Sequence, residues 1–318
     1  MIASMVLLAY VAFLAGIVAP HLRRARWVEH APGWGLAAWI ALAWSLVLSA
    51  ALAVMVLCLQ LPSSPAQLYR ATALCLQALG GNLGVPATLV AALSLTGLIA
   101  GAVRLIHMLA RQGWRTTRRR YEHRQALRLL GRTDDSLGAV VLDDHRPTAY
   151  CIPGGHGHVV LTTAALDRLT PAQVQSVLAH ERAHLRGRHA LLIAAGTLPA
   201  HLLPLRAMQH AACAVTRLVE YAADDTASHR TDRLALAEAL LTLGTPPPSP
   251  TSTLAATATA TPARITRLLD DSGGRQEGST LAAPTAIASM SVPFLLAVSS
   301  THLGGAWNAC LFGLAFPC

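Results

Sequence analysis

The segment His180-Glu181-Arg182-Ala183-His184 places two histidines four residues apart, with a glutamate beside the first. On a helix, residues four apart lie one turn apart on the same face, so the two imidazoles can take two corners of a tetrahedral zinc site. Glu181 is then close enough to take a proton from a water that zinc activates, without being a ligand itself. Chance gives about 0.01 matches to this motif in a chain of this composition. The motif therefore predicts a catalytic zinc centre.

Two acids further along the chain can complete this centre. Glu220 and Asp224 are four residues apart, so they share one face of a predicted helix. Glu220 can be the third ligand of a His₂Glu set. Asp224 can accept a hydrogen bond from the free ring nitrogen of a ligand histidine and so fix its tautomer, although Asp225 is an alternative for this role. The alternative interpretation of all these residues is a solvated, charged helix surface.

The elements around the motif predict a small domain that contains both strands and helices. Three short segments are predicted to be extended: 138–143, 150–153 and 157–162. Thr170 followed by Pro171 is typical of a helix start, so the motif lies on a helix that begins there and has Gly187 as a candidate end. Two later helices are predicted: 207–228 and 263–270.

Composition indicates that much of the chain lies in a membrane. Of the 318 residues, 53% are hydrophobic and 13% are charged, whereas soluble domains carry about 25% charged residues. An ordinary soluble enzyme and a disordered charged tail are thereby excluded. Four apolar segments are long enough to span a bilayer: 1–20, 36–61, 85–109 and 282–303.

The distribution of charge predicts the orientation of these spans. All basic residues are arginines, and eight of them lie within 111–132 against a single acid. The segment 62–83, by contrast, contains a single basic residue, Arg70. Basic residues collect on the cytoplasmic side, so we expect the N-terminus and 62–83 outside, and 21–35 and the chain from residue 111 to the last span in the cytoplasm. The net charge of +9 is explained by these loops, and no direct contact with nucleic acid is expected.

Two segments of the cytoplasmic part stand apart in composition. Residues 190–205 are apolar but interrupted by Pro199 and Pro204, which predicts a membrane-contacting or re-entrant segment. Residues 244–262 are rich in Pro, Thr and Ala, which predicts a mobile loop. The sequence leaves open whether the enzyme cleaves itself, for which this exposed loop is a candidate site. Three cysteines are expected outside the cell: Cys75, Cys310 and Cys318. The sequence does not decide whether two of them form a disulfide or all remain free thiols.

At these residues the chain resembles the BlaR/MecR-type integral-membrane zinc metallopeptidases, and more distantly the HtpX-type and CAAX-prenyl-protease-type enzymes. The likeness rests on the His-Glu-x-x-His helix after a strand, the Glu-x-x-x-Asp helix, Ala-Arg-Ile at 263–265 and the apolar segments. The resemblance implies a gluzincin endopeptidase that holds one Zn²⁺ by His180, His184 and Glu220, with Glu181 as the base. In well-studied members an extracellular penicillin-binding sensor follows the last span, and the protease cuts a cytoplasmic repressor. This chain ends at residue 318, so we expect a truncated form without that sensor.

The predicted fold is mainly α, with about four membrane helices and a small α+β zincin-like metalloprotease domain that has a short sheet. Three membrane helices are expected within 1–110 and the protease domain within 111–280. A final membrane helix and a short extracellular tail are expected within 281–318. The expected partners are a protein substrate, of which a BlaI/MecI-like repressor is one, and the lipid bilayer.

Two further roles at the predicted site can be assigned to candidate residues. The strand before the motif helix is predicted to be an exposed edge with which a substrate backbone pairs, and the alternative is a strand in the core. Its candidate substrate-binding residues are Val159, Val160 and Leu161. Three side chains are candidates to stabilise the oxyanion: Tyr221, His229 and Arg264. The remaining histidines nearby are interpreted as interfacial or surface residues rather than ligands: His189, His201 and His210.

The leading hypothesis is thus a membrane-anchored zinc endopeptidase that acts on the cytoplasmic side or at the membrane interface, in a signalling pathway. A second hypothesis is a non-catalytic signal transducer in which zinc only holds the fold. The complete ligand set beside Glu181 argues against it, because a structural site needs no base and usually has four protein ligands. A third is a protease that cuts within the membrane or removes damaged membrane proteins.

Overall fold

The computed structural model describes residues 2–60, 121–153, 157–244 and 260–270, together with scattered positions between 103 and 118. The chain divides into two compact units. The first unit comprises Met1–Phe13, Leu46–Arg118 and Ser291–Cys318. The second comprises Leu14–Ser45 and Arg119–Met290. All the candidate site residues belong to the second unit.

Two helical stretches near the N-terminus are long and apolar enough to cross a membrane: Met5–Arg24 and Pro32–Ala53. The first runs through three elements: α1 (Ile2–Phe13), the π-helical turn η1 (Leu14–Val18) and α2 (Ala19–Arg24). The second is the greater part of α4 (Pro32–Gln60), and the short helix α3 (Trp27–His30) precedes it. The described residues thus contain two such helices, fewer than the four predicted.

Several predictions concern residues outside the described part of the chain. They are the span 282–303, nearly all of the span 85–109, most of the loop 244–262, and three cysteines: Cys75, Cys310 and Cys318. Two cysteines in the described part, Cys151 and Cys213, are free thiols.

Four short strands form one mixed sheet: β1 (Gly131–Asp134), β2 (Ala139–Leu142), β3 (Ala149–Ile152) and β4 (His158–Thr162). Their order in the sheet is β1-β2-β4-β3, with β2 and β4 parallel and the other neighbouring pairs antiparallel. The β1–β2 turn is set by Asp134, whose carboxylate accepts hydrogen bonds from the following backbone, and by Gly138, whose φ is 56°. The three predicted extended segments are strands within one residue of their predicted bounds, whereas β1 was not foreseen.

The predicted edge strand is in fact an interior strand. β4 pairs with β2 on one side and with β3 on the other. Its residues Val159, Val160 and Leu161 are at most 4% exposed, so they offer no free edge to a substrate. The prediction is wrong because an uninterrupted Val-Val-Leu run is typical of a strand covered on both faces rather than of an edge. Among the described strands, β3 forms the edge at this end of the sheet.

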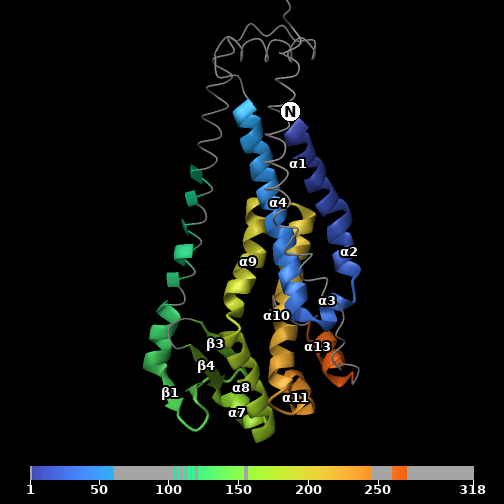
Figure 1. Ribbon diagram of the computed structural model, residues 1–318. Helices are drawn as coiled ribbons and strands as arrows, with labels where there is room; N and C mark the ends of the chain where they lie inside the picture. Colours follow the sequence, from blue (N-terminus) through green and yellow to red (C-terminus); the bar gives the residue numbers. More distant parts are fainter. Residues whose placement is uncertain are drawn as a thin grey trace, which may run out of the picture. The chain divides into compact units, whose positions relative to one another are not determined.

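The helix that carries the histidine motif is α8 (Pro171–Arg186), preceded by the short helix α7 (Thr163–Arg168). It starts with a reciprocal capping box, in which the Thr170 side chain accepts from the Gln173 N–H and the Gln173 side chain accepts from the Thr170 N–H. One face of α8 packs on the sheet through Val174, Val177 and Leu178. Figure 1 shows α8 between the sheet and α10.

An antiparallel pair of helices follows: α9 (His189–Leu202) and α10 (Arg206–Ser228). Pro199 lies inside α9 and does not break it, contrary to the predicted interruption. Because proline has no N–H, the carbonyl of Ala195 lacks its helical partner. The indole of Trp44 in α4 donates to that carbonyl at 3.0 Å, which satisfies it.

Residues 121–130, before β1, are also helical. Two further helices follow α10 in this unit: α11 (Arg233–Gly244) and α13 (Ala260–Leu269). A core cluster joins both of them to α8 and α10. Its members are Ala179, Ala227, Leu236, Ala237 and Leu268. Helix α13 is thereby fixed beside the two helices that carry the candidate site.

Candidate active site

Three potential metal ligands converge from two helices. His180 and His184 lie one turn apart on α8, and their Nε2 atoms are 3.0 Å from each other. The carboxylate oxygens of Glu220, on α10, lie 3.5 Å from Nε2 of His180 and 3.6 Å from Nε2 of His184. A tetrahedral zinc site with bonds of about 2.0 Å has ligand–ligand edges of about 3.3 Å. These three separations therefore fit a single zinc ion.

Short side chains between the helices make this convergence possible. Ala179 and Ala183 on α8, and Ala223 and Ala227 on α10, are all buried. Packed helices lie about 8 to 10 Å apart depending on the side chains at the contact, and alanines favour the shorter distance. At that separation the side chain of Glu220 reaches the two imidazoles.

Asp224 and Arg264 support the ligands from the side of α10 and α13. The Arg264 guanidinium binds Asp224 in a bidentate manner, with Nε–Oδ2 at 2.8 Å and Nη2–Oδ1 at 2.6 Å. Its Nη1 atom lies 3.0 Å from Oε2 of Glu220. The Oδ1 atom of Asp224 also lies 3.0 Å from Nδ1 of His180, which leaves Nε2 facing the other ligands. This is the orienting contact that metal-binding histidines commonly have.

His189 contacts the ring of His184 much as Asp224 contacts the ring of His180. From the sequence, His189 is interpreted as an interfacial or surface residue. The Nδ1 atoms of the two histidines are 3.0 Å apart, and His189 is 6% exposed. Arg188, with a φ of 49°, turns the chain back toward α8, and any side chain at Gly187 would collide with the His189 ring. The tight turn after the ligand helix is the signal that could have identified this contact.

Glu181 lies in the same cavity as the ligands and contacts the thiol of Cys151 on β3. Burial raises the pKa of Glu181 above its ordinary value. Burial and the neighbouring Glu181 carboxylate raise the pKa of Cys151 to about 12, so this side chain remains a thiol that donates to Glu181. A carboxylate with a raised pKa is suited to accept and then release a proton near neutral pH. Cys151 was not predicted as a site residue.

The cluster carries an excess of negative charge. The carboxylates of Glu181, Glu220 and Asp224 face one guanidinium, that of Arg264, which leaves two negative charges when all are ionised. Burial acts to lower the pKa of His180, but the carboxylates of Asp224 and Glu220, 3.0 Å and 3.5 Å from its ring nitrogens, raise the pKa to about 9. A divalent cation would balance this excess, and two imidazoles with a carboxylate are ligands that zinc prefers. Both charge and donor type therefore fit Zn²⁺.

The ligands line a cavity of about 640 Å³. The edge strand β3 forms one wall through Ala149, Tyr150 and Cys151. Apolar residues of three helices form another part: Val177, Ala190, Ile193, Leu236 and Leu240. The cavity therefore combines a strand edge that can pair with a peptide backbone and an apolar surface that can receive a side chain.

Of the three candidates for oxyanion stabilisation, only Arg264 lines this cavity. Tyr221 is buried on another side of α10, with the Arg267 guanidinium 5.1 Å from its ring centre. It follows Glu220 directly, so its side chain is rotated by about 100° around the helix. His229 is exposed at the C-terminal end of α10. The structure thus does not bring Tyr221 or His229 to the ligand cluster.

A comparison with known protein families matches residues 113–203 to Peptidase family M48. The matched segment contains the sheet, α8 and α9, and it ends before Glu220 and Arg264. Neither a search of curated proteins nor a search of solved structures found a match. The part of the chain that presents His180, Glu181 and His184 is therefore similar to a family of metallopeptidases.

Proposed function

We propose that this chain is a membrane-anchored, zinc-dependent endopeptidase that cuts a protein substrate at the cytoplasmic face of the membrane. The observation that carries the proposal is the convergence of His180, His184 and Glu220 in one cavity with Glu181. A half-buried acid that is free of the ligand set, as Glu181 is, has no role in a purely structural zinc site. Two apolar helices long enough to span a membrane support the anchoring.

The chain's own residues supply most of the steps of hydrolysis. His180, His184 and Glu220 would hold the zinc ion, which when bound acts as a Lewis acid toward water and the scissile carbonyl. Glu181 takes a proton from the attacking water and passes it to the amide nitrogen as the C–N bond breaks. Arg264, held by Asp224, places positive charge where the carbonyl oxygen becomes negative.

The walls of the cavity indicate how a substrate binds. An extended substrate segment pairs with the free edge of β3, in place of the β4 edge that the sequence predicts. Ala190 and Ile193 of the apolar helix α9 line the same cavity, which favours a substrate close to the membrane surface. We propose a cytoplasmic repressor of BlaI/MecI type as such a substrate, on the sequence resemblance alone.

The test uses the full chain, purified in detergent and loaded with zinc, with mass spectrometry of unstructured protein substrates. We expect Glu181→Gln to keep its zinc and to cleave about 10²- to 10⁴-fold more slowly than the wild type. The matched control is Asp167→Asn, which changes an exposed acid outside the cavity and should cleave normally. Equal cleavage by Glu181→Gln would contradict the proposed base. A zinc-loaded wild type that cuts no protein would favour the non-catalytic transducer.

A further inference from the structure

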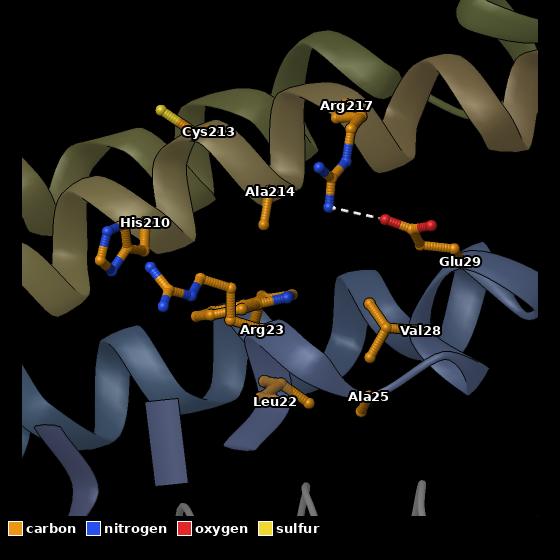
Figure 2. Close-up of a pocket in the computed structure, with 10 residues that line it drawn as sticks. Leu22, Arg23, Ala25, Val28, Glu29, His210, Cys213, Ala214 and Arg217 are labelled. Atoms are coloured by element: carbon orange, nitrogen blue, oxygen red, sulfur yellow. Dashed lines mark ion pairs between the residues drawn. The ribbon is translucent and has the colours of Figure 1, made fainter. Parts of the chain in front are cut away.

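A second cavity, of about 210 Å³, lies between the C-terminal end of α2 and helix α10 (Figure 2). Leu22, Arg23 and Val28 line it from the N-terminal segment. His210, Ala214 and Arg217 line it from α10. None of its residues lines the catalytic cavity. The proposed hydrolysis therefore leaves this cavity without a role.

The cavity presents more positive than negative groups. Among the described residues that line it, Glu29 is the one acid, and Oε1 of Glu29 lies 3.0 Å from Nη2 of Arg217, so these two charges balance. Arg23 and His210 have no hydrogen-bonding or ion-pair partner among the residues that the structure describes. Figure 2 shows the Arg23 guanidinium extending toward the His210 ring. Two donors from separate elements thus point into one cavity, and the carboxylate that its described lining contains is already paired, an arrangement suited to an anion.

The place of Arg23 in the chain indicates the source of that anion. Arg23 lies in the last turn of the candidate span Met5–Arg24. When this helix crosses a membrane, its last turn lies at the level of the phospholipid head groups. The cytoplasmic leaflet is rich in anionic lipids, and basic pockets beside membrane helices on that side bind their phosphates. The apolar side chains of Leu22, Val28 and Ala214 suit the glycerol part of the same molecule.

We propose that this cavity binds the phosphodiester group of an anionic phospholipid, with Arg23 and His210 donating to its oxygens. The cavity, of about 210 Å³, has room for a phosphate and a glycerol group but not for acyl chains, which extend into the bilayer. The proposal rests on the membrane anchoring proposed above and not on the peptidase activity.

The test compares two neighbouring arginines of the full chain. Arg23→Gln removes the donor that lines the cavity, whereas Arg24→Gln removes an equal charge from an exposed side chain that does not line it. Native mass spectrometry measures retention of phosphatidylglycerol against phosphatidylcholine by the detergent-solubilised protein. We expect Arg23→Gln to lose the preference for phosphatidylglycerol by about tenfold or more and Arg24→Gln to keep it. His210→Gln, on the opposite wall, should weaken the same preference.

Each other outcome overturns a stated part of the proposal. An equal loss in Arg23→Gln and Arg24→Gln would mean that general surface charge attracts the lipid. Thermal stabilisation by inorganic phosphate as large as that by phosphatidylglycerol would assign the cavity to a soluble anion. Release of the wild type from membranes by alkaline carbonate would contradict the anchoring. Cleavage by the same variants, measured separately, tests the peptidase and is expected to stay at the wild-type rate.

Discussion

At the scale of single residues, the two ligand histidines differ sharply in proton affinity although they belong to one motif. Burial lowers the pKa of His184 to about 4. His180 is still more buried, yet the carboxylates of Asp224 and Glu220 outweigh burial and raise its pKa to about 9. At neutral pH the metal-free protein therefore keeps His184 ready to bind a metal, while His180 must first give up a proton.

Zinc binding should therefore release about one proton near pH 7.5, and the affinity should rise with pH until about 9. The number of protons is measured by isothermal titration calorimetry in buffers of different ionisation enthalpy. The raised pKa of His180 also stabilises the metal-free fold below pH 6.5, and this contribution to stability is lost as the pH rises from 6.5 to about 9. Zinc binding without proton release would contradict a protonated His180 in the metal-free protein.

His189 should control how firmly zinc is held, because it accepts the proton of Nδ1 when His184 binds the metal through Nε2. His189→Phe keeps a ring but no acceptor, and we expect it to bind zinc about 10- to 100-fold more weakly. His189→Asn retains an acceptor and should lose less. Competition with a chelator measures the affinity, and thermal unfolding in EDTA checks that the metal-free fold is unchanged. Wild-type affinity in His189→Phe would show that the contact does not orient His184.

The sequence predicts the part of the site that local geometry determines. Helical spacing alone places His180 and His184 on one face, and likewise Glu220 and Asp224. The contacts of Cys151 and His189 depend on strand order and on a turn, which no spacing within a helix reveals. In the sequence, Arg264 is one of three candidates for stabilising the oxyanion. Only the packing of α13 against α10 places it beside the metal ligands.

At the scale of elements, the contact between α4 and α9 explains how a proline is accommodated inside a helix. Pro199 leaves the Ala195 carbonyl free, and the Trp44 indole donates to it at 3.0 Å. A buried carbonyl without a partner costs about 1 to 3 kcal/mol. Trp44 therefore stabilises α9 as well as packing beside it.

A double-mutant cycle tests this pairing. Trp44→Phe should destabilise the protein by about 1 to 3 kcal/mol, because the Ala195 carbonyl loses its donor. In a Pro199→Ala background residue 199 regains an N–H for that carbonyl, so Trp44→Phe should cost less. Thermal unfolding of the four proteins in the same detergent gives the coupling free energy. Strictly additive effects would show that Trp44 contributes only its packing.

The existence of most elements follows from sequence, but their pairing does not. The Thr170-Pro171 start of α8 and the apolar runs of the three predicted strands are local signals. Which strand forms the edge depends on the order β1-β2-β4-β3, in which β4 enters between β2 and β3. A run of apolar residues predicts a buried strand, and it cannot say which neighbours cover it.

At the scale of the whole molecule, the unit that holds the site is built from two distant parts of the chain. Residues 14–45 and 119–290 form it together. Gly35 lies so close to Leu218 that a side chain there would crowd it. Arg267 of α13 donates to the Glu29 carbonyl and pairs with Asp225 on α10. The N-terminal segment is therefore part of the support of the candidate site.

A fragment restricted to 119–290 should consequently fail to form a protease-resistant domain, because it lacks the surface on which α9 and α10 pack. Co-expression of a separate 1–60 segment should restore resistance. Limited proteolysis with detection of both pieces measures this. A stable 119–290 fragment would show that the N-terminal segment only anchors the chain.

The order in which the chain is made has a consequence for Asp224. Arg264, its bidentate partner, lies 40 residues later. At a synthesis rate of about 5 to 20 residues per second, Asp224 leaves the ribosome roughly 2 to 8 seconds before Arg264. Both histidines and Glu220 are also present by then. Each newly made molecule thus passes through an interval in which all three zinc ligands exist but the Arg264 guanidinium that pairs with Asp224 does not. A chain whose synthesis stops between Asp224 and Arg264 stays in that state.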